Sequence, residues 1–239
     1  MPNEVEYILV GNRIPFEYFL TKGVGESSIT VHAGSLDGAM QNAGIENYNI
    51  LKYTSIMPGI AKEVPRPKRD VFEVNYKGKA KIVHGSVCEA IMAQADSIID
   101  ERATAGLVIG WIYDKETNKR YGGLVAEYSG KEEEEDAANN LEQMMKRMAR
   151  HRLEDRKNLE LRDVKITTAS IVPKKKHGTA IVGIGFLSYV IPKLKDMTQK
   201  DLDELYAYKS LDLPKVDGQN AAPKAEAAGN GTPPKGPNP

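Results

Sequence analysis

The sequence predicts an α+β fold in which antiparallel sheet is covered by helices. Short runs with strand-like alternation dominate the chain, and turn-rich links join several of them in the manner of hairpins. Few helical segments lie between these runs, and the principal one is a long amphipathic stretch. Together these observations favour layered sheet over an alternating strand–helix fold.

The strand-like runs are residues 28–32, 48–54, 85–93, 105–113 and 122–128. The turn-rich segment 114–119 joins the last two, which predicts a hairpin. A second hairpin is expected between residues 164–172 and 179–189, across the basic turn 174–178. Gly23-Val24-Gly25 and Gly183-Ile184-Gly185 look like fragments of glycine-rich loops, but neither has the full dinucleotide-binding spacing.

Two helices are predicted inside the core region. The first covers residues 35–42, with Ser35 as its N-cap and Gly44 as its left-handed stop. The second runs from about residue 132 to 158, and its acidic start suits the positive end of the helix dipole. Its apolar stripe comprises Ala137, Leu141, Met144, Met145 and Met148. A third, weaker helix is expected at residues 198–208.

Composition limits the possible functions. The 239 residues include 33 basic and 33 acidic side chains, and this balance argues against a broad nucleic-acid-binding surface. Cys88 is the single cysteine, so no intrachain disulfide can form, and its apolar surroundings predict a buried residue. No signal peptide or membrane-length apolar stretch is visible, so a cytoplasmic protein without membrane contact is expected.

The chain is expected to fold as one domain over residues 1–213. Residues 214–239 are rich in Pro, Ala, Gly and Lys, cannot bury a core and are predicted to be a disordered tail. The four histidines lack metal-ligand spacing, so no metal site is expected. No Gly-x-Ser-x-Gly elbow occurs either.

The stretch from Leu36 to Pro58 carries the chemistry. It contains Asp37-Gly38-Ala39-Met40, then Ala43-Gly44-Ile45-Glu46-Asn47, then Asn49, and finally Thr54-Ser55-Ile56-Met57-Pro58. Together with Gly122-Gly123-Leu124-Val125-Ala126-Glu127-Tyr128, this ordered set resembles the pyruvoyl-dependent arginine decarboxylases. The resemblance covers roughly residues 15–190 and implies a four-layer αββα sandwich.

The residues around Ser55 suit self-cleavage. The Ser55 hydroxyl can attack the Thr54 carbonyl in a strained turn, which replaces the amide by an ester. Elimination and hydrolysis then yield a covalent pyruvoyl group, a β chain ending at Thr54 and an α chain starting at position 55. The attack creates an oxyanion that needs a fixed donor, and the resemblance implies that Asn49 is this donor.

The resemblance also assigns the substrate chemistry. The pyruvoyl ketone forms a Schiff base with the α-amine of L-arginine, and loss of CO2 leads to agmatine. Glu127 is implied as the acid that protonates Cα, which requires a pKa raised by an apolar surround. Asp37 is implied as the carboxylate for the guanidinium group, and Tyr48 and Ile56 as further residues of the substrate pocket.

Each of these residues also has a plain structural interpretation. Ser55 is compatible with an ordinary strand end, Asn49 and Glu127 with exposed strand positions, and Asp37 with a favourable charge in a first helical turn. The substrate can also be lysine, ornithine or aspartate. A relative that keeps the fold without cleaving would be a binding protein. The family implies trimers, often paired as hexamers, with active sites between subunits.

Overall fold

The computed structural model describes residues 7–67 and 84–197. The chain divides into two compact units, one of them Val10–Lys193 and the other made of the chain ends Met1–Leu9 and Leu194–Pro239. Among the described residues of the ends, β1 (Tyr7–Val10) pairs with β13 (Lys193–Met197). The predicted helix 198–208 and the predicted disordered tail 214–239 lie outside the described residues.

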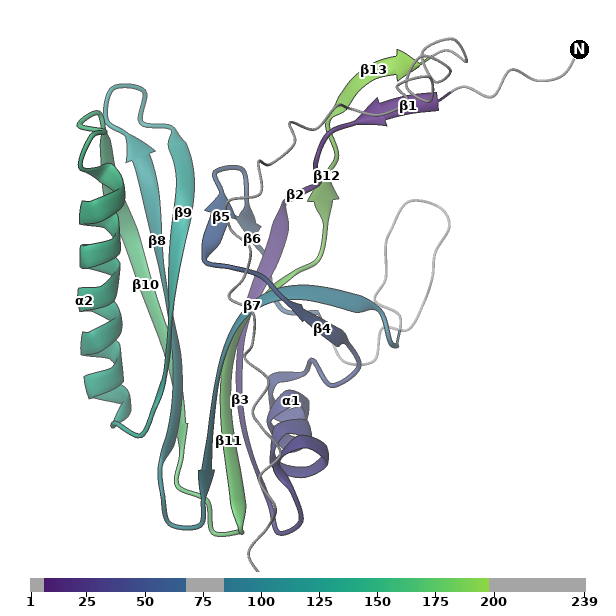
Figure 1. Ribbon diagram of the computed structural model, residues 1–239, viewed down its shortest axis with the longest axis vertical. Helices are drawn as coiled ribbons and strands as arrows, with labels where there is room; N and C mark the ends of the chain where they lie inside the picture. Colours follow the sequence, from purple (N-terminus) through teal and green to yellow (C-terminus); the bar gives the residue numbers. More distant parts are fainter. Residues whose placement is uncertain (1–6, 68–83, 198–239) are drawn as a thin grey trace, which may run out of the picture. The chain divides into compact units, whose positions relative to one another are not determined.

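The unit Val10–Lys193 is a mixed α+β fold of mostly antiparallel sheets, as the sequence predicts (Figure 1). Its helices are α1 (Asp37–Ala43), preceded by the helical turn Val31–Leu36, and α2 (Glu134–Leu153). Its strands are β2 (Ile14–Pro15), β3 (Glu17–Ser27), β4 (Asn49–Lys52), β5 (Ile56–Pro58), β6 (Lys62–Glu63), β7 (Val87–Ile98), β8 (Ala103–Asp114), β9 (Arg120–Gly130), β10 (Leu159–Ile171), β11 (His177–Phe186) and β12 (Tyr189–Val190).

Two sheets form the body of this unit. The five-stranded sheet has the order β4-β7-β11-β3-β6, and the four-stranded sheet has the order β10-β8-β9-β5. The long strands β3, β7 and β11 pair antiparallel, whereas the short edge strands β4 and β6 pair parallel with their neighbours. In the four-stranded sheet every pairing is antiparallel. A short pair, β2 with β12, completes the unit's described sheets.

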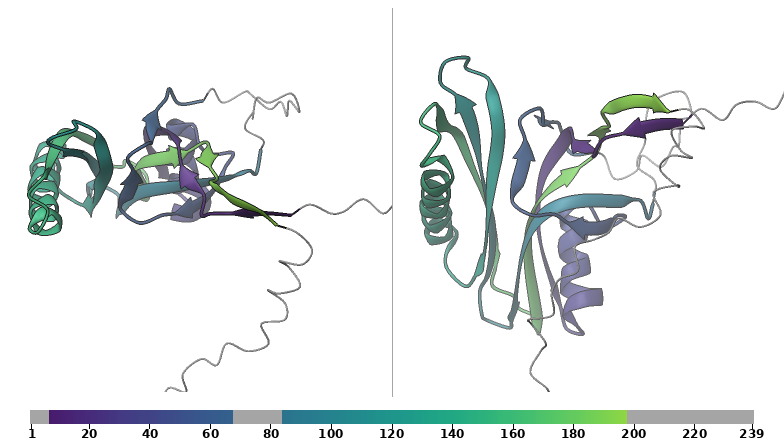
Figure 2. Two further views of the ribbon diagram at one scale, coloured as in Figure 1. Left: turned by 90° about the horizontal axis from the view of Figure 1, so that it is seen from above. Right: turned by 45° about the horizontal axis from the view of Figure 1, so that its top comes forward.

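Three clusters of buried side chains connect these elements. One contains residues of both sheets, among them Leu107 and Val125 from the four-stranded sheet and Ile91 and Ile184 from the five-stranded sheet. The second joins α2 to the four-stranded sheet, and the third joins α1 to the five-stranded sheet. Figures 1 and 2 show α2 lying along β8, β9 and β10, and α1 lying beside β3 and β11. No helix in the described ranges is long and apolar enough to cross a membrane.

The predicted helices are confirmed, with corrections. Helix α1 ends at Gly44, whose φ of 69° is left-handed as expected. Ser35 is not an N-cap but lies buried inside the preceding helical turn, where its Oγ is 2.9 Å from Thr179 Oγ1. In α2, Ala137, Leu141, Met145 and Ala149 are the buried residues, whereas Met144 is 41% exposed because it points away from the sheet.

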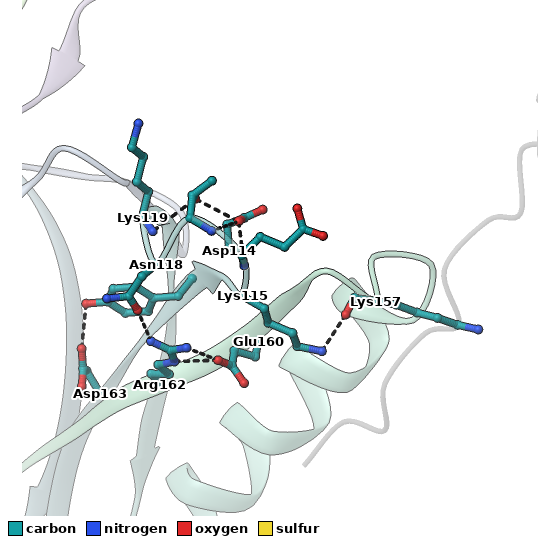
Figure 3. A network of polar contacts seen from close by, with 11 residues as sticks. Asp114, Lys115, Asn118, Lys119, Lys157, Glu160, Arg162 and Asp163 are labelled. Atoms are coloured by element: carbon teal, nitrogen blue, oxygen red, sulfur yellow. Dashed lines mark hydrogen bonds and ion pairs between the residues drawn. The ribbon is translucent and has the colours of Figure 1, made fainter.

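The hairpin β8–β9 is confirmed, and its turn holds a network of polar contacts (Figure 3). The carboxylate of Asp114 accepts bonds from the Thr117 amide at 2.8 Å and the Thr117 hydroxyl at 2.9 Å, which hold the Asp114 pKa below its usual range. Asn158 donates to the same carboxylate at 3.1 Å and connects the turn to the start of β10. The turn chemistry therefore agrees with the sequence prediction.

The second predicted hairpin is wrong. Strand β10 pairs with β8, whereas β11 pairs with β3 and β7, so the basic turn carries the chain from one sheet to the other. The physical reason is that β11 is buried along nearly its whole length. The backbone N–H and C=O groups at both of its edges are then shielded from water, so each edge needs a neighbouring strand to bond with. The alternation of apolar and polar residues in the sequence does not identify which strands pair with β11.

The predicted strand at residues 28–32 is also wrong. Strand β3 ends at Ser27, whose Oγ accepts the amide of Ile29 at 3.1 Å, and the helical turn starts at Val31. Ile29 is 84% exposed and contributes nothing to a sheet face. The glycines before this point belong to β3 instead of a loop: a Cβ at Gly23 or Gly25 would overlap the backbone of α1 or the turn preceding it.

Candidate functional site

The segment Thr54–Ser55 lies where the chain passes from one sheet to the other. Upstream, β4 belongs to the five-stranded sheet, where Lys52 pairs with Ala90 of β7. Downstream, β5 belongs to the four-stranded sheet, where Ile56 pairs with Leu124 of β9. Cutting the Thr54–Ser55 bond would therefore remove a covalent link between the sheets and leave each new end paired within its own sheet.

Backbone hydrogen bonds hold both sides of this crossover. The amide of Tyr53 donates to the Ala90 carbonyl at 2.7 Å, and the amide of Val125 donates to the Ser55 carbonyl at 2.9 Å. Only Thr54 lies between these two anchored residues. Hydrogen bonds to a different sheet on each side therefore constrain the backbone at Thr54–Ser55.

The backbone closes a tight turn at Ser55. The amide of Ile56 donates to the Thr54 carbonyl at 3.0 Å, which spans three residues with Ser55 in the middle. Ser55 is half-buried, Thr54 is exposed and Ile56 is 46% exposed. The carbonyl that a Ser55 nucleophile would attack is thus already polarised by a backbone donor.

The residues after the turn are held firmly as well. Met57 is 1% exposed and belongs to the cluster shared by the two sheets. Arg120 donates from Nε to the Gly59 carbonyl at 2.7 Å and from Nη2 to the Ala61 carbonyl, and its guanidinium lies 3.9 Å from the centre of the Trp111 ring. This arginine, which the sequence did not single out, anchors the loop that follows β5.

Glu127 lies on β9, two residues beyond the Val125 amide that binds Ser55. Because side chains alternate along a strand, Glu127 points to the same side as Val125, toward the other sheet. Glu127 as a whole is exposed in the single chain, yet partial burial of its carboxyl raises its pKa. The Lys52 charge and a hydrogen bond from the Met92 backbone lower the pKa and offset part of this rise. The direction agrees with the requirement for a protonated carboxyl.

Asn49 has a different partner in this structure. It begins β4 and is exposed, and its Nδ2 donates to the Gly85 carbonyl at 2.7 Å, while its amide donates to the Ser86 carbonyl at 2.9 Å. The Thr54 carbonyl receives the Ile56 amide instead. The oxyanion role of Asn49 therefore stays a prediction from family resemblance.

The residues expected at the substrate's far end lie on another part of the unit. Asp37 is exposed at the start of α1 and accepts a bond from Gln41 of the same helix at 2.6 Å. Tyr48 packs against the cluster beneath α1, and its buried hydroxyl has no hydrogen-bond partner among the described residues. Within the described chain, no hydrogen bond or ion pair connects either residue to Ser55.

Ile56 faces a cleft of about 550 Å³ beside the cleavage turn. Two cations line it, Arg152 in the last turn of α2 and Arg156 in the turn that follows the helix, and Arg156 donates to the Tyr121 hydroxyl at 2.7 Å. Positive charge is unsuited to the guanidinium group of arginine. The remaining lining residues are Met57, Pro58, Ile112, Gly122, Gly123, Leu124 and Leu153.

Three other residues near the turn were given no role from the sequence. Lys52, Tyr53 and Glu89 flank the crossover on the five-stranded sheet. Glu89 offered a signal, since it is a single charge inside the apolar run Val87-Cys88-Glu89-Ala90-Ile91-Met92. Cys88 in the same run is buried as predicted, and burial raises its pKa to about 11, which makes it an unreactive thiol.

Comparisons with known proteins agree with the motif order. The family model described as pyruvoyl-dependent arginine decarboxylase matches residues 17–191. The chain is 31% identical over 191 residues to pyruvoyl-dependent arginine decarboxylase AaxB of Chlamydia muridarum, which covers 75% of this chain and 94% of that protein. It is also 31% identical over 121 residues to pyruvoyl-dependent arginine decarboxylase 2 of Methanosarcina mazei, which covers 51% of this chain and 59% of that protein.

Proposed function

Because the chain belongs to the pyruvoyl-dependent arginine decarboxylases, we propose that it cleaves itself between Thr54 and Ser55 and converts L-arginine to agmatine and CO2. The observation that carries the proposal is the position of Thr54–Ser55 in a tight turn between two sheets, with a backbone anchor on each side. This position allows the bond to break while both products stay folded.

The cleavage needs no external reagent except water. The Ser55 hydroxyl adds to the Thr54 carbonyl carbon, the C–N bond breaks, and an ester with a free Ser55 amine results. Loss of the Ser55 Cα proton then expels the Thr54 carboxylate and leaves dehydroalanine. Addition of water and loss of ammonia produce the pyruvoyl group at the start of the α chain.

Charge on the Thr54 oxygen must be stabilised during the first step. The Ile56 amide is already 3.0 Å from that oxygen in the uncleaved chain. Asn49 lies six residues before Ser55, and its side chain would have to leave the Gly85 carbonyl to act as a second donor. In the uncleaved chain a backbone donor is therefore in place, and the role of Asn49 as a second donor rests on the family resemblance.

The residues present fit a pyruvoyl group at position 55. The group would withdraw the electron pair that remains when CO2 leaves the substrate. Glu127 would supply the proton for the substrate's Cα, since its raised pKa keeps more of the carboxyl protonated. The Ser55 carbonyl, held by Val125, fixes position 55 beside the β9 segment that carries Glu127.

Substrate binding requires more than one chain in this proposal. Asp37 begins α1, and Tyr48 packs against the cluster beneath that helix. Both lie away from the cleavage turn, so the guanidinium group of the substrate would meet Asp37 of a second copy. A trimer, or two paired trimers, provides such a site. The order α2, four-stranded sheet, five-stranded sheet, α1 supports a four-layer αββα sandwich for each subunit. We place the enzyme in the cytoplasm, because its single cysteine needs no oxidising compartment.

An intact-mass spectrum of the purified, denatured protein tests the proposal. Two chains that meet at Thr54 and Ser55, the larger lighter by one ammonia than a seryl terminus requires, would support it. A panel of arginine, lysine, ornithine and aspartate then identifies the substrate by CO2 release. A single uncleaved, inactive chain would contradict the enzyme and favour a binding protein.

A further inference from the structure

A buried carboxylate lies next to the cleavage segment and has no part in the chemistry proposed above. Glu89 of β7 has a side chain only 3% exposed, and its Oε1 forms an ion pair with Arg13. Burying a carboxylate is costly unless other groups compensate it. Glu89 therefore needs an explanation beyond the packing of an otherwise apolar strand.

Two tyrosines, Tyr53 and Tyr189, lie near this carboxylate. Burial first, then the hydrogen bond to Glu89 and its charge, raise the pKa values of both Tyr53 and Tyr189. The Arg13 guanidinium also lies 5.0 Å from the centre of the Tyr189 ring. Glu89 Oε2 has no hydrogen-bond partner among the described residues, so the carboxylate has an acceptor atom available to these hydroxyls.

Tyr53 connects this cluster to the scissile bond. Its amide donates to the Ala90 carbonyl at 2.7 Å, and its ring centre is 5.6 Å from that of Phe186. Its hydroxyl lies close enough to Glu89 for the carboxylate, after burial, to raise the Tyr53 pKa. Two contacts thus hold the residue immediately before Thr54, and the Glu89 carboxylate lies near its hydroxyl. On the other side of the bond, Ser55 is held by Val125.

We infer that Glu89 is a positioning residue for self-cleavage, which acts through Tyr53 to hold the Thr54 carbonyl in reach of the Ser55 hydroxyl. Arg13 neutralises the carboxylate, and Tyr189 completes its surround. An apolar residue at position 89 would fill the same space without orienting the Tyr53 hydroxyl. The inference rests on the proposed self-cleavage, and deepens it by naming what holds the upstream side of the bond.

The test measures the first-order rate of self-cleavage of freshly folded full-length chain. Tyr53→Phe keeps the ring and deletes the hydroxyl, and Glu89→Gln keeps the shape and deletes the charge. Each is expected to slow cleavage about tenfold, the effect of losing a hydrogen bond to a charged group. If Glu89 acts through Tyr53, the double variant is no slower than the slower single variant.

The matched control is Tyr113→Phe, which removes a tyrosine hydroxyl bonded to a carboxylate, Asp163, at 2.7 Å in the other sheet. It should cleave at the wild-type rate. Melting temperatures of the same variants in a Ser55→Ala background report structural damage separately. Once cleavage is complete, kcat per pyruvoyl group should equal that of the wild type.

Single-variant rates within twofold of wild type, or additive effects in the double variant, would overturn the inference. So would lower melting temperatures combined with unchanged cleavage. Failure of the wild-type chain to cleave would instead overturn the proposed function, so the two failures are distinguishable. If Glu89→Gln does not fold, Tyr53→Phe alone decides the matter.

Discussion

The carbonyl oxygen of Thr54 accepts a hydrogen bond from the backbone amide of Ile56 at 3.0 Å, across the intervening Ser55. The amide of Val125 binds the Ser55 carbonyl, so in the alternating antiparallel ladder the polar groups of Ile56 point away from β9. The Ile56 amide is thus free to serve the turn. A donor that is built into the turn itself is available before any side chain moves.

Replacing Ile56 by proline deletes this donor. We expect Ile56→Pro to slow self-cleavage about 100-fold, the typical effect of losing one oxyanion donor. Time courses of band separation on denaturing gels measure the rate. Ile56→Val keeps the amide and is the matched control, and a melting curve checks that the proline variant is folded. Equal rates for both variants would show that the turn needs no donor at this position.

Asn49→Ala separates the two candidate oxyanion donors. We expect slow but complete cleavage, because the Ile56 amide remains, and a further loss when Ile56→Pro is added. Mass spectrometry of samples quenched over time gives the rates. Wild-type cleavage in Asn49→Ala would mean that the side chain serves only its bond to the Gly85 carbonyl.

Glu127→Gln should cleave normally and lose about 100-fold or more in kcat, since the variant lacks the proton donor. In the wild type, kcat should fall as pH rises through the raised pKa of Glu127, because only the protonated carboxyl donates.

The Lys52 charge lowers the pKa of Glu127, so Lys52→Met should move the fall in kcat to higher pH. Rates of CO2 release across a pH series locate the fall in kcat. Lys115→Met, in the β8–β9 turn, is the control. An unshifted profile in Lys52→Met would argue against Glu127 as the donor.

Gly25→Ala tests the contact between β3 and the α1 region. The new Cβ would overlap the Ser35 carbonyl and the Ala39 amide, neither of which can rotate away. We expect the free energy of unfolding to fall by about 1–3 kcal/mol or more. Gly183→Ala is the control, because its nearest neighbour, Met92 Cγ, is 3.5 Å away on a flexible side chain. Denaturant unfolding in a Ser55→Ala background compares them.

Shared active sites predict complementation between two inactive variants. Ser55→Ala lacks the pyruvoyl group, and Asp37→Ala lacks the carboxylate for the guanidinium group. If the two come from different subunits, co-expression should restore a fraction of wild-type activity in mixed oligomers. Arginine decarboxylation by the purified mixture is measured against each variant alone. Activity no higher than the sum of the separate variants would place Asp37 within its own subunit's site or outside the site altogether.

Several features were visible in the order of residues alone. The β8–β9 hairpin follows from its turn residues, the end of α1 from Gly44, and the buried stripe of α2 from its helical spacing. The cleavage motif could also be identified in the sequence, because the residues that react, Thr54 and Ser55, are adjacent. Such features depend on local conformational preference, which a short stretch of sequence contains.

Other features depended on contacts between distant segments. The pairing of β11 with β3 and β7, and the ion pair of Glu89 with Arg13, involve residues far apart in the chain. The sequence by itself determined which residues could carry the chemistry. Only the tertiary structure decided that Thr54–Ser55 bridges two sheets, because strand pairing is settled by burial on both faces and by the hydrogen bonds that each edge must satisfy.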